Sequence, residues 1–448
     1  MATPAPIAHL VESTPSRSGR IPAALVLLLS ALTAVGPLTI DLYLAAFPDI
    51  ATELGTSAAT VQLTMTTTLI GLALGQLVIG SVSDALGRRR PLLAAFALYA
   101  VVSIAIAFVS SIGALAALRG VQGFAASAGM VMSMAIVRDR FSGPRVAKVI
   151  ARLMLVVGVA PILAPTLGAQ ILRFGDWRTM FFVLAGVGAA LLVLVALFLR
   201  ESLPAQYRRT GGLGPALASY GSLLRDRSFV ALALLAGFYM AAMFTYVSTS
   251  TFVFQEGYGL TAQQFALVFG AGAIAVTAGS QINGALAGRV TPERILSVVV
   301  PTGVVLSLLL VVVAATAGRT VDGLLPLVGV LVLVLGTAGF VMPSVPAIAL
   351  ERNAHQAGSA AALLGASQFG VGAAIAPVTG LFGEGDALTM ALVMSGTILV
   401  AAGLLLVVAR GWTREARAIP APAPASDGVP SPAVAVAEAE AAVVAETA

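Results

Sequence analysis

Long apolar runs separated by short polar segments cover the chain from about residue 22 to residue 410. A helix needs about 20 apolar residues to cross a bilayer, and twelve runs reach that length. We expect them at 22–46, 59–82, 91–111, 114–137, 147–171, 179–199, 229–253, 264–287, 295–316, 322–346, 357–381 and 387–409. The pattern predicts an all-α integral membrane protein with twelve transmembrane helices.

Composition supports this prediction. Of 448 residues, 58% are hydrophobic and only 10% are charged, and the mean hydropathy is +0.99. No soluble domain of this size is expected to be so apolar. The chain has no cysteine, so disulfides and thiolate metal sites are excluded. A net charge of +5 needs no nucleic acid to explain it, and the expected surroundings are a lipid bilayer.

The lysines and arginines predict the orientation. With the N-terminus in the cytoplasm, the inside segments carry 21 of the 25 basic residues and the outside loops carry only Arg173, Arg178 and Arg319. Positive charge favours the cytoplasmic side, so both termini are expected there and the protein in the cell membrane. A signal peptide after Arg17 and Arg20 is the alternative, but the apolar run is long and lacks a clear cleavage site.

A polar stretch near the middle divides the spans into two sets of six. The expected organisation is a tail (1–20), a six-helix bundle (21–200), a cytoplasmic linker (201–228), a second bundle (229–411) and a proline-containing tail (412–448). The composition of the last segment predicts disorder.

The two halves share a repeated motif. Residues 157–168 read VGVAPILAPTLG and residues 369–380 read FGVGAAIAPVTG, at the fifth and eleventh spans. A fainter echo of the loop at 80–90 occurs at 284–289. Duplicated halves are typical of carriers that work by alternating access. Chance recurrence in a chain rich in Ala, Gly and Val is the alternative.

The segment between the second and third spans contains three arginines and an aspartate, which lipid cannot accommodate. Its candidate gating residues are Gly80, Asp84, Gly87, Arg88 and Arg89. The charges can pin helix ends together, and Asp84 can face the positive end of a helix dipole. Plain anchoring by positive charge explains part of the arginine cluster.

Two charged residues are expected well inside spans, Asp41 in the first and Arg119 in the fourth. A central charge costs about 2.5 to 3.5 kcal/mol on insertion scales, so both point to function. Their distances from the outer helix ends place them at similar depth, roughly 8 to 9 Å below that surface. The functional hypothesis is that Asp41 binds the coupling proton with Arg119 nearby. A permanent ion pair that fixes helix packing is the alternative.

Further candidates have structural alternatives. Gly158, Pro161, Pro165 and Gly168 in the fifth span predict a bend that is either a pivot between bundles or a static kink. Candidate substrate contacts are Tyr43, Gln76, Gln122, Tyr239, Met243, Tyr246 and Gln368. Gln122 is expected first as a helix contact, and the aromatic stripe of the seventh span also fits simple packing.

These motifs resemble the major facilitator superfamily, specifically the drug:proton antiporter branch with its bicyclomycin/chloramphenicol-resistance (Bcr/CflA) group, over residues 22–410. The loop at 80–89 resembles the superfamily signature. Arg119, Gln122 and Gly123 resemble the fourth-helix motif, and 158–168 resembles the antiporter motif, with Ala164 and Ala169 where glycine is usual. The run 41–48 resembles the first-helix pattern, with Ala45 where proline often occurs, and 358–361 resembles the opening of the eleventh helix.

The resemblance implies the fold of that superfamily, two six-helix bundles, and a monomeric exporter of small amphipathic drugs driven by protons, with no cofactor. It also implies that Asp84 faces the start of the eleventh helix in an outward-open state. A transporter for one metabolite, such as a sugar, an amino acid or a siderophore, is the alternative. An enzyme is not expected, because the chain has two histidines, no HExxH and no Walker A motif.

Overall fold

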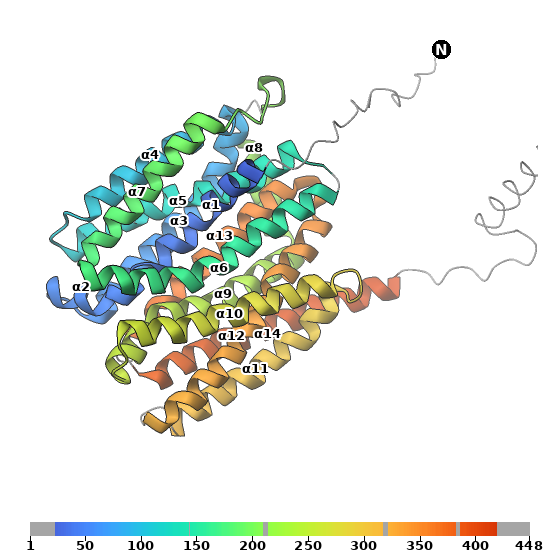
Figure 1. Cartoon of the computed structure of the whole chain (residues 1–448). Helices are drawn as coiled ribbons and strands as arrows, with labels where there is room; N and C mark the ends of the chain where they lie inside the picture. Colours follow the sequence, from blue (N-terminus) through green and yellow to red (C-terminus); the bar gives the residue numbers. More distant parts are fainter. Residues whose placement is uncertain (1–22, 143, 209–213, 317–320, 382–385, 419–448) are drawn as a thin grey trace, which may run out of the picture. The chain divides into compact units, whose positions relative to one another are not determined.

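The computed structural model describes residues 23–142, 144–208, 214–316, 321–381 and 386–418. Residues up to 405 belong to one compact unit and those from 406 to another, and α14 crosses this boundary. In the described part the elements are helical throughout. They are α1 (Ala23–Asp41), η1 (Leu44–Ala46), α2 (Phe47–Glu53), α3 (Ala58–Leu86), α4 (Arg89–Ile106), α5 (Ile112–Arg140), α6 (Pro144–Phe174), α7 (Trp177–Phe198), η2 (Ala205–Tyr207), α8 (Gly214–Arg225), α9 (Arg227–Thr251), η3 (Phe252–Gly257), α10 (Ala262–Leu286), α11 (Pro292–Thr316), η4 (Val321–Gly323), α12 (Leu324–Arg352), η5 (Ala354–Gln356), α13 (Ala357–Ile375), η6 (Ala376–Leu381) and α14 (Ala387–Ala418) (Figure 1).

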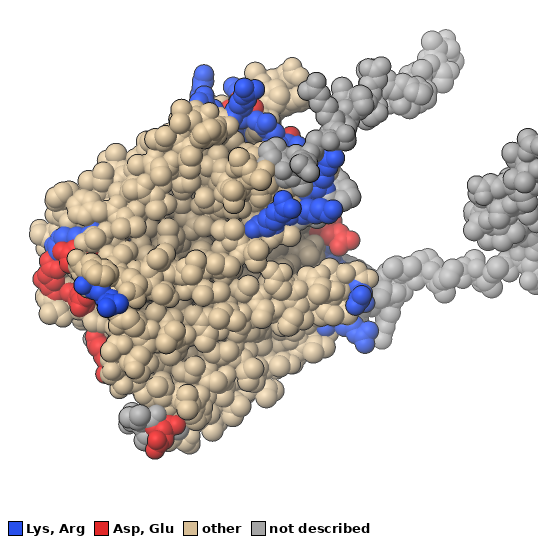
Figure 2. Space-filling model, in the orientation of Figure 1, with Lys and Arg blue, Asp and Glu red and all other residues tan. Residues whose placement is uncertain are grey.

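Twelve helical segments of the described chain are long and apolar enough to cross a membrane, which confirms the expected number. The protein is therefore a multi-pass membrane protein. On the face drawn in Figure 2, charged side chains gather toward two opposite ends and the surface between them is almost free of charge. Such an uncharged band matches the hydrocarbon layer of a bilayer.

Several helix ends differ from the expected ones because capping residues set them. Ser111 caps α5 by accepting a hydrogen bond from the Ala114 backbone N–H at 3.3 Å, so the fourth span begins at Ile112 rather than at residue 114. The third span, α4, ends at Ile106 rather than near residue 111. The first span continues through η1 into α2, where Pro48 occupies the first turn. The last helix continues to Ala418, past the boundary expected at 411, and residues 419–448 lie outside the described residues, as do residues 1–22.

Glycine contacts join corresponding helix pairs in the two halves. In the first half, a methyl group on Gly71 would lie 2.0 Å from the Gly120 carbonyl oxygen, where α3 packs on α5. In the second half, a methyl group on Gly339 would lie 2.2 Å from the Val276 carbonyl oxygen, where α12 packs on α10. Small residues allow such backbone approach between membrane helices. The second and fourth spans of each half therefore pack in the same way.

The two halves also contact each other through corresponding helices. The fifth span, α6, packs against the eighth, α10, and the eleventh, α13, packs against the second, α3 (Figure 1). Exchanging the halves converts one contact into the other. This arrangement supports the internal repeat inferred from the motifs at 157–168 and 369–380.

Three of the hydrogen bonds between the halves lie at the end opposite the Arg88 loop. Thr251 donates to the Leu44 carbonyl at 3.1 Å, and Gln255 donates to the Ala45 carbonyl at 3.4 Å. Thr379 donates to Gln62 Oε1 at 3.3 Å. These bonds hold the first and seventh spans together, and likewise the second and eleventh, near one membrane surface.

Candidate transport site and charged loop

Arg119 is fully buried and connects three helices of the first half. Its Nη1 donates to Gln122 Oε1 at 2.7 Å, and its Nη2 donates to the Thr39 carbonyl of α1 at 2.9 Å. Gln122 Nε2 in turn donates to the Ser103 hydroxyl of α4 at 2.7 Å. The guanidinium carbon lies 4.0 Å from the centre of the Tyr43 ring, a cation–π contact. This network holds α1, α4 and α5 together.

Asp41 lies at the C-terminal end of α1 and its side chain is buried, with the residue 5% exposed. Within the described part of the chain, its carboxyl group makes no hydrogen bond and no ion pair. Arg119 is therefore not its partner in this conformation. The alternative of a permanent ion pair between these two residues does not describe this structure.

The helical repeat explains why the two charges do not meet. Arg119 contacts the Thr39 carbonyl near the end of α1 and the Tyr43 ring just after that helix ends. Asp41 is two residues after Thr39 on α1, so its side chain projects about 200° around the helix axis from that of Thr39. Asp41 and Arg119 are therefore at similar depth in the membrane, but the Asp41 side chain points away from Arg119.

The structure places two of the candidate substrate contacts inside the first half. Tyr43 is fully buried and its hydroxyl lies 3.1 Å from the Thr64 hydroxyl of α3. Gln122 is fully buried with both ends of its amide hydrogen-bonded, and a methyl group on Gly123 would lie 2.2 Å from the Thr68 carbonyl oxygen. The expectation that this face is first a helix contact agrees with this geometry.

The aromatic candidates of the seventh span face different neighbours. The Tyr239 hydroxyl faces Gly303 of α11 and Thr337 of α12, inside the second half. The Tyr246 ring stacks on Phe269 of α10 with ring centroids 5.4 Å apart, and its hydroxyl lies beside Gly272 of the same helix. Within the described part of the chain, the buried hydroxyl groups of both tyrosines have no hydrogen-bond partner. Met243 lies between them in sequence and is half-buried. The structure therefore does not bring the two hydroxyl groups to one point.

Gln76 and Gln368 lie on the two helices that join the halves through α3 and α13. A methyl group on Gly365 of α13 would lie 2.9 Å from Gln76 Oε1, so these helices are in close contact at Gln76. Gln368 is half-buried, one turn further along α13. Both amides thus belong to helices at the junction of the halves.

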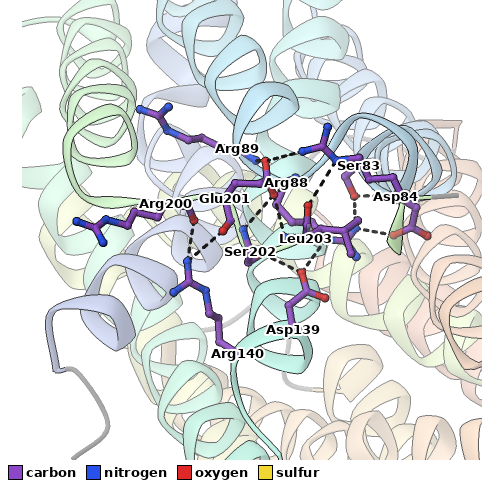
Figure 3. Close-up of polar contacts among 12 residues, drawn as sticks. Ser83, Asp84, Arg88, Arg89, Asp139, Arg140, Arg200, Glu201, Ser202 and Leu203 are labelled. Atoms are coloured by element: carbon purple, nitrogen blue, oxygen red, sulfur yellow. Dashed lines mark hydrogen bonds and ion pairs between the residues drawn. The ribbon is translucent and has the colours of Figure 1, made fainter. Parts of the chain in front are cut away.

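The loop after α3 forms a charged cluster, shown in Figure 3. Arg88 Nη1 contacts Asp84 Oδ1 at 2.5 Å, and Arg88 Nε contacts Asp139 Oδ2 of α5 at 3.0 Å. Arg89 Nη2 donates to the Ala196 carbonyl of α7 at 2.7 Å. Through these contacts the two arginines connect the ends of α3, α5 and α7. Asp84 pairs with Arg88 here, rather than with the start of α13.

Glu201 is the residue of this cluster that sequence reasoning missed. Its carboxylate accepts hydrogen bonds from the backbone N–H groups of Arg88 at 2.8 Å, Arg89 at 3.2 Å, and Ser202 and Leu203 at 3.0 Å each. Arg88 is the N-cap of α4 and supplies no side-chain acceptor, so Glu201 caps that helix from a distant part of the chain. A carboxylate at a helix N-terminus also interacts favourably with the helix dipole.

These bonds affect the ionisation of Glu201. Partial burial by itself would raise the pKa of the carboxyl group, but the backbone N–H donors outweigh burial and hold the pKa below its usual range. Gly87 makes the approach possible, because its φ of 90° disfavours other residues and a methyl group there would lie 2.6 Å from Glu201 Oε2. In contrast, Gly80 has room for a methyl group, 3.6 Å from Val131.

The fifth-span motif lies on α6, which remains helical through Pro161 and Pro165. The Gly158 carbonyl accepts a hydrogen bond from Thr277 of α10 at 3.0 Å, which joins the two halves. A methyl group on Gly168 would lie 2.1 Å from the Leu42 carbonyl oxygen, so α6 also approaches the end of α1 closely. The motif therefore lies between Asp41's helix and the second half.

The fold and these buried polar residues define a polytopic α-helical carrier built from two six-helix halves. The chain belongs to the Major Facilitator Superfamily, whose family profile matches residues 27–377. It is a transporter family, so the expected substrate is a small molecule rather than a reactant in an enzymatic step. The superfamily fold predicted from the sequence is confirmed.

Two relatives and one solved structure show which proteins of this kind the chain resembles. The chain is 40% identical over 385 residues to the uncharacterized MFS-type transporter YdgK of Bacillus subtilis, covering 86% of this chain and 94% of that one. It is 29% identical over 381 residues to the bicyclomycin resistance protein homolog of Haemophilus influenzae, covering 84% and 93%. A bacterial homolog of the human lysosomal transporter Spinster, solved inward-facing and unoccupied, shares the fold with a TM-score of 0.67 at 16% identity, covering 89% and 99%.

Proposed function

We propose that this protein exports small amphipathic compounds, including drugs, from the cytoplasm in exchange for protons. The name of the Haemophilus influenzae relative supports a drug as substrate. The Bcr/CflA-like motifs support the same branch of the superfamily. The observation on which proton coupling depends is Asp41, a buried carboxyl group without a partner among the described residues.

An ionised carboxylate without a hydrogen bond or counter-ion is costly in an apolar interior. The end of α1 adds to this cost, since the C-terminus of a helix carries partial negative charge. A proton on Asp41 removes the charge and most of the cost. We therefore assign Asp41 as the group that takes up the coupling proton, with Arg119 as a fixed positive charge on the other face of α1.

Alternating access is supported by where the halves meet. The hydrogen bonds from Thr251, Gln255 and Thr379 close the end opposite the Arg88 loop. With that loop in the cytoplasm, as the positive charges favour, this conformation is closed toward the outside. Asp84, paired with Arg88 here, would be released to reach the start of α13 when the cytoplasmic ends close.

The experiment compares drug resistance in cells that express the wild type, Asp41→Asn or Asp49→Asn from the same plasmid. Asp49 is the matched control, because it is an exposed carboxylate eight residues further along the chain on α2. Bicyclomycin is the first compound to test, and proton release is measured in inverted vesicles when it is added.

We expect resistance and drug-induced proton release with the wild type and with Asp49→Asn, and neither with Asp41→Asn at equal expression. Equal resistance from all three proteins would contradict the role of Asp41. Transport of one metabolite without any drug resistance would favour the alternative of a dedicated metabolite carrier.

A further inference from the structure

Three basic side chains share one face of α6 near its N-terminal end. They are Arg145, Lys148 and Arg152, and all three are exposed. Seven residues separate Arg145 from Arg152, a rotation of about 700°, so the two side chains project within about 20° of each other. By the same count, Lys148 projects within about 40° of Arg152. We call these three residues the α6 basic stripe.

The contacts of α6 with its neighbours show which side of the helix faces away from the protein. A methyl group on Gly158 would lie 2.9 Å from Thr277 of α10, and one on Gly168 would lie 2.1 Å from the Leu42 carbonyl oxygen just after α1. Leu163 is five residues from each glycine, so its side chain projects about 140° around the axis from both contacts. It is 52% exposed. Lipid tails are as apolar as leucine, so an exposed leucine on this side of a membrane-spanning helix faces the bilayer.

The α6 basic stripe continues this lipid-facing side. Arg152 is eleven residues before Leu163, about three turns, and the two side chains project within about 20° of each other. Leu167, one turn after Leu163, is 50% exposed, so the apolar surface extends along the helix. Figure 2 shows basic side chains that reach from one charged end over α6 into the otherwise uncharged band. The stripe is therefore part of the surface that contacts the membrane.

Position along the helix places the stripe at the depth of lipid headgroups. The 31 residues of α6 extend over about 46 Å, close to the roughly 40 to 45 Å of a bilayer with its headgroups. From the first residue, Pro144, the distances along the axis to Arg145, Lys148 and Arg152 are about 1.5, 6 and 12 Å. The headgroup layer is about 5 to 8 Å thick on each side. Arg145 and Lys148 thus lie in that layer, and the long Arg152 side chain can extend back to it from just below.

No acidic side chain neutralises the stripe in the described part of the chain. The ion pairs there involve Arg88, Arg178 and Arg208, and α6 itself contains no Asp or Glu. Asp139, near the end of the preceding helix, is bound to Arg88. A cation on a surface that touches lipid is costly without a counter-charge. The counter-charges that a membrane offers at this depth are the phosphate groups of its lipids.

We propose that Arg145, Lys148 and Arg152 bind the headgroup of an anionic phospholipid in the inner leaflet. The bond between Asp139 and Arg88 places this end of α6 on the side of the Arg88 loop, which the positive charges assign to the cytoplasm. Charge complementarity identifies the lipid, because phosphatidylglycerol has a net negative charge, whereas a zwitterionic lipid also carries a cation that the stripe repels. The bound lipid lies against the helix that packs on both α1 and α10, where the two halves meet. This inference is independent of the proposed proton coupling.

The test counts lipid molecules bound to the full-length protein by native mass spectrometry. The protein in a non-ionic detergent is titrated with phosphatidylglycerol or with phosphatidylcholine of the same acyl chains. The stripe variant combines Arg145→Gln, Lys148→Gln and Arg152→Gln. The control variant loses the same number of charges from exposed residues expected on the cytoplasmic side, and it combines Arg225→Gln, Arg289→Gln and Arg294→Gln.

One basic residue near an anionic membrane surface strengthens binding by about fivefold. We therefore expect the dissociation constant of the first phosphatidylglycerol to rise at least about fivefold in the stripe variant and to keep its wild-type value in the control variant. Phosphatidylcholine binding should not change in either variant. The replaced side chains are exposed, so all three proteins should melt at the same temperature. Equal binding of the two lipids by the wild type would overturn the proposal, as would equal losses in both variants.

Two further measurements use the wild type alone. Its preference for phosphatidylglycerol should fall between about 0.1 and 1 M salt, because the Debye length shrinks from about 10 to 3 Å. A preference that does not respond to salt would contradict an ionic contact. Glycerol phosphate, the headgroup without acyl chains, should not displace the lipid at equal concentration. Displacement would show that the stripe binds a soluble phosphate and would overturn the assignment to a membrane lipid.

Discussion

The contact between α3 and α5 offers a sharp test of the packing argument. Gly123 and Gly120 lie on the same helix, one turn apart, and both face α3. A methyl group on Gly123 would lie 2.2 Å from the Thr68 carbonyl oxygen, whereas one on Gly120 would lie 3.4 Å from the Thr67 carbonyl oxygen. Replacing each glycine with alanine therefore adds the same methyl group at one site that has no room for it and at another that has room.

The expected magnitudes follow from these distances. Real Cβ contacts essentially never fall under 3.0 Å, so Gly123→Ala must push the α3 backbone away by at least 0.8 Å. Overpacking of this kind costs about 1 to 3 kcal/mol. Alanine is a better helix former than glycine by about 1 kcal/mol, but this gain applies to both variants and cancels in the comparison. Gly123→Ala should thus be less stable than Gly120→Ala by about 1 to 3 kcal/mol.

The assay is thermal unfolding of the two variants and the wild type in the same detergent. A difference of 1 kcal/mol corresponds to about 2 to 4 °C for a unit of 150 to 250 residues, close to the size of one half. Gly120→Ala should melt at or slightly above the wild-type temperature, and Gly123→Ala several degrees below Gly120→Ala. Equal melting temperatures would refute the inference that backbone approach at Gly123 holds α3 against α5.

Three other outcomes are expected. Glu201→Ala should lower stability by about 1 to 3 kcal/mol in thermal melts, because the backbone N–H groups of Arg88 and Arg89 lose their acceptor. Ser222→Ala, which changes an exposed side chain on α8, is the control. Because the folded-state pKa of Glu201 lies below its usual value of 4.5, the stabilisation is complete above that pH and is lost as the pH falls through the lower value. The melting difference between wild type and Glu201→Ala should therefore be constant from pH 8 to about 5 and shrink in stronger acid, and a change near neutral pH would contradict this assignment. Arg119→Lys should abolish drug resistance and lower the melting temperature although the positive charge is kept, because an ammonium group does not reproduce the planar guanidinium that reaches both Gln122 and Thr39. Wild-type resistance in this variant would show that a positive charge alone is sufficient for transport.

The twelve spans could be predicted because lipid imposes one dominant requirement on the sequence, a sufficiently long apolar run. The ends of these spans were harder to predict, because single side chains determine where a helix begins or ends. Ser111 caps the N-terminus of α5 by accepting a backbone hydrogen bond. Pro48 lies in the first turn of α2, just beyond the end expected for the first span at residue 46. Local capping of this kind acts within one turn and leaves little trace in average hydropathy.

Glu201 was missed for a different reason. The Arg88 loop is recognisable by itself, but its capping carboxylate comes from 113 residues further along the chain. One signal was available: α4 begins at arginines without a Ser, Thr, Asp or Asn to cap it, so an acceptor had to come from elsewhere. The carboxylate that follows directly after the sixth span was the natural candidate.

Asp41 and Arg119 show how far a sequence argument reaches inside a membrane helix. Counting residues from a helix end gives depth, since every residue adds 1.5 Å, but pairing also depends on rotation about the helix axis. Rotation is set by packing, here by the contacts of Arg119 with the Thr39 carbonyl and the Tyr43 ring. Asp41, two residues after Thr39, projects about 200° around the axis from it, and this rotation, rather than the depth, is why the two charges do not form an ion pair in this structure.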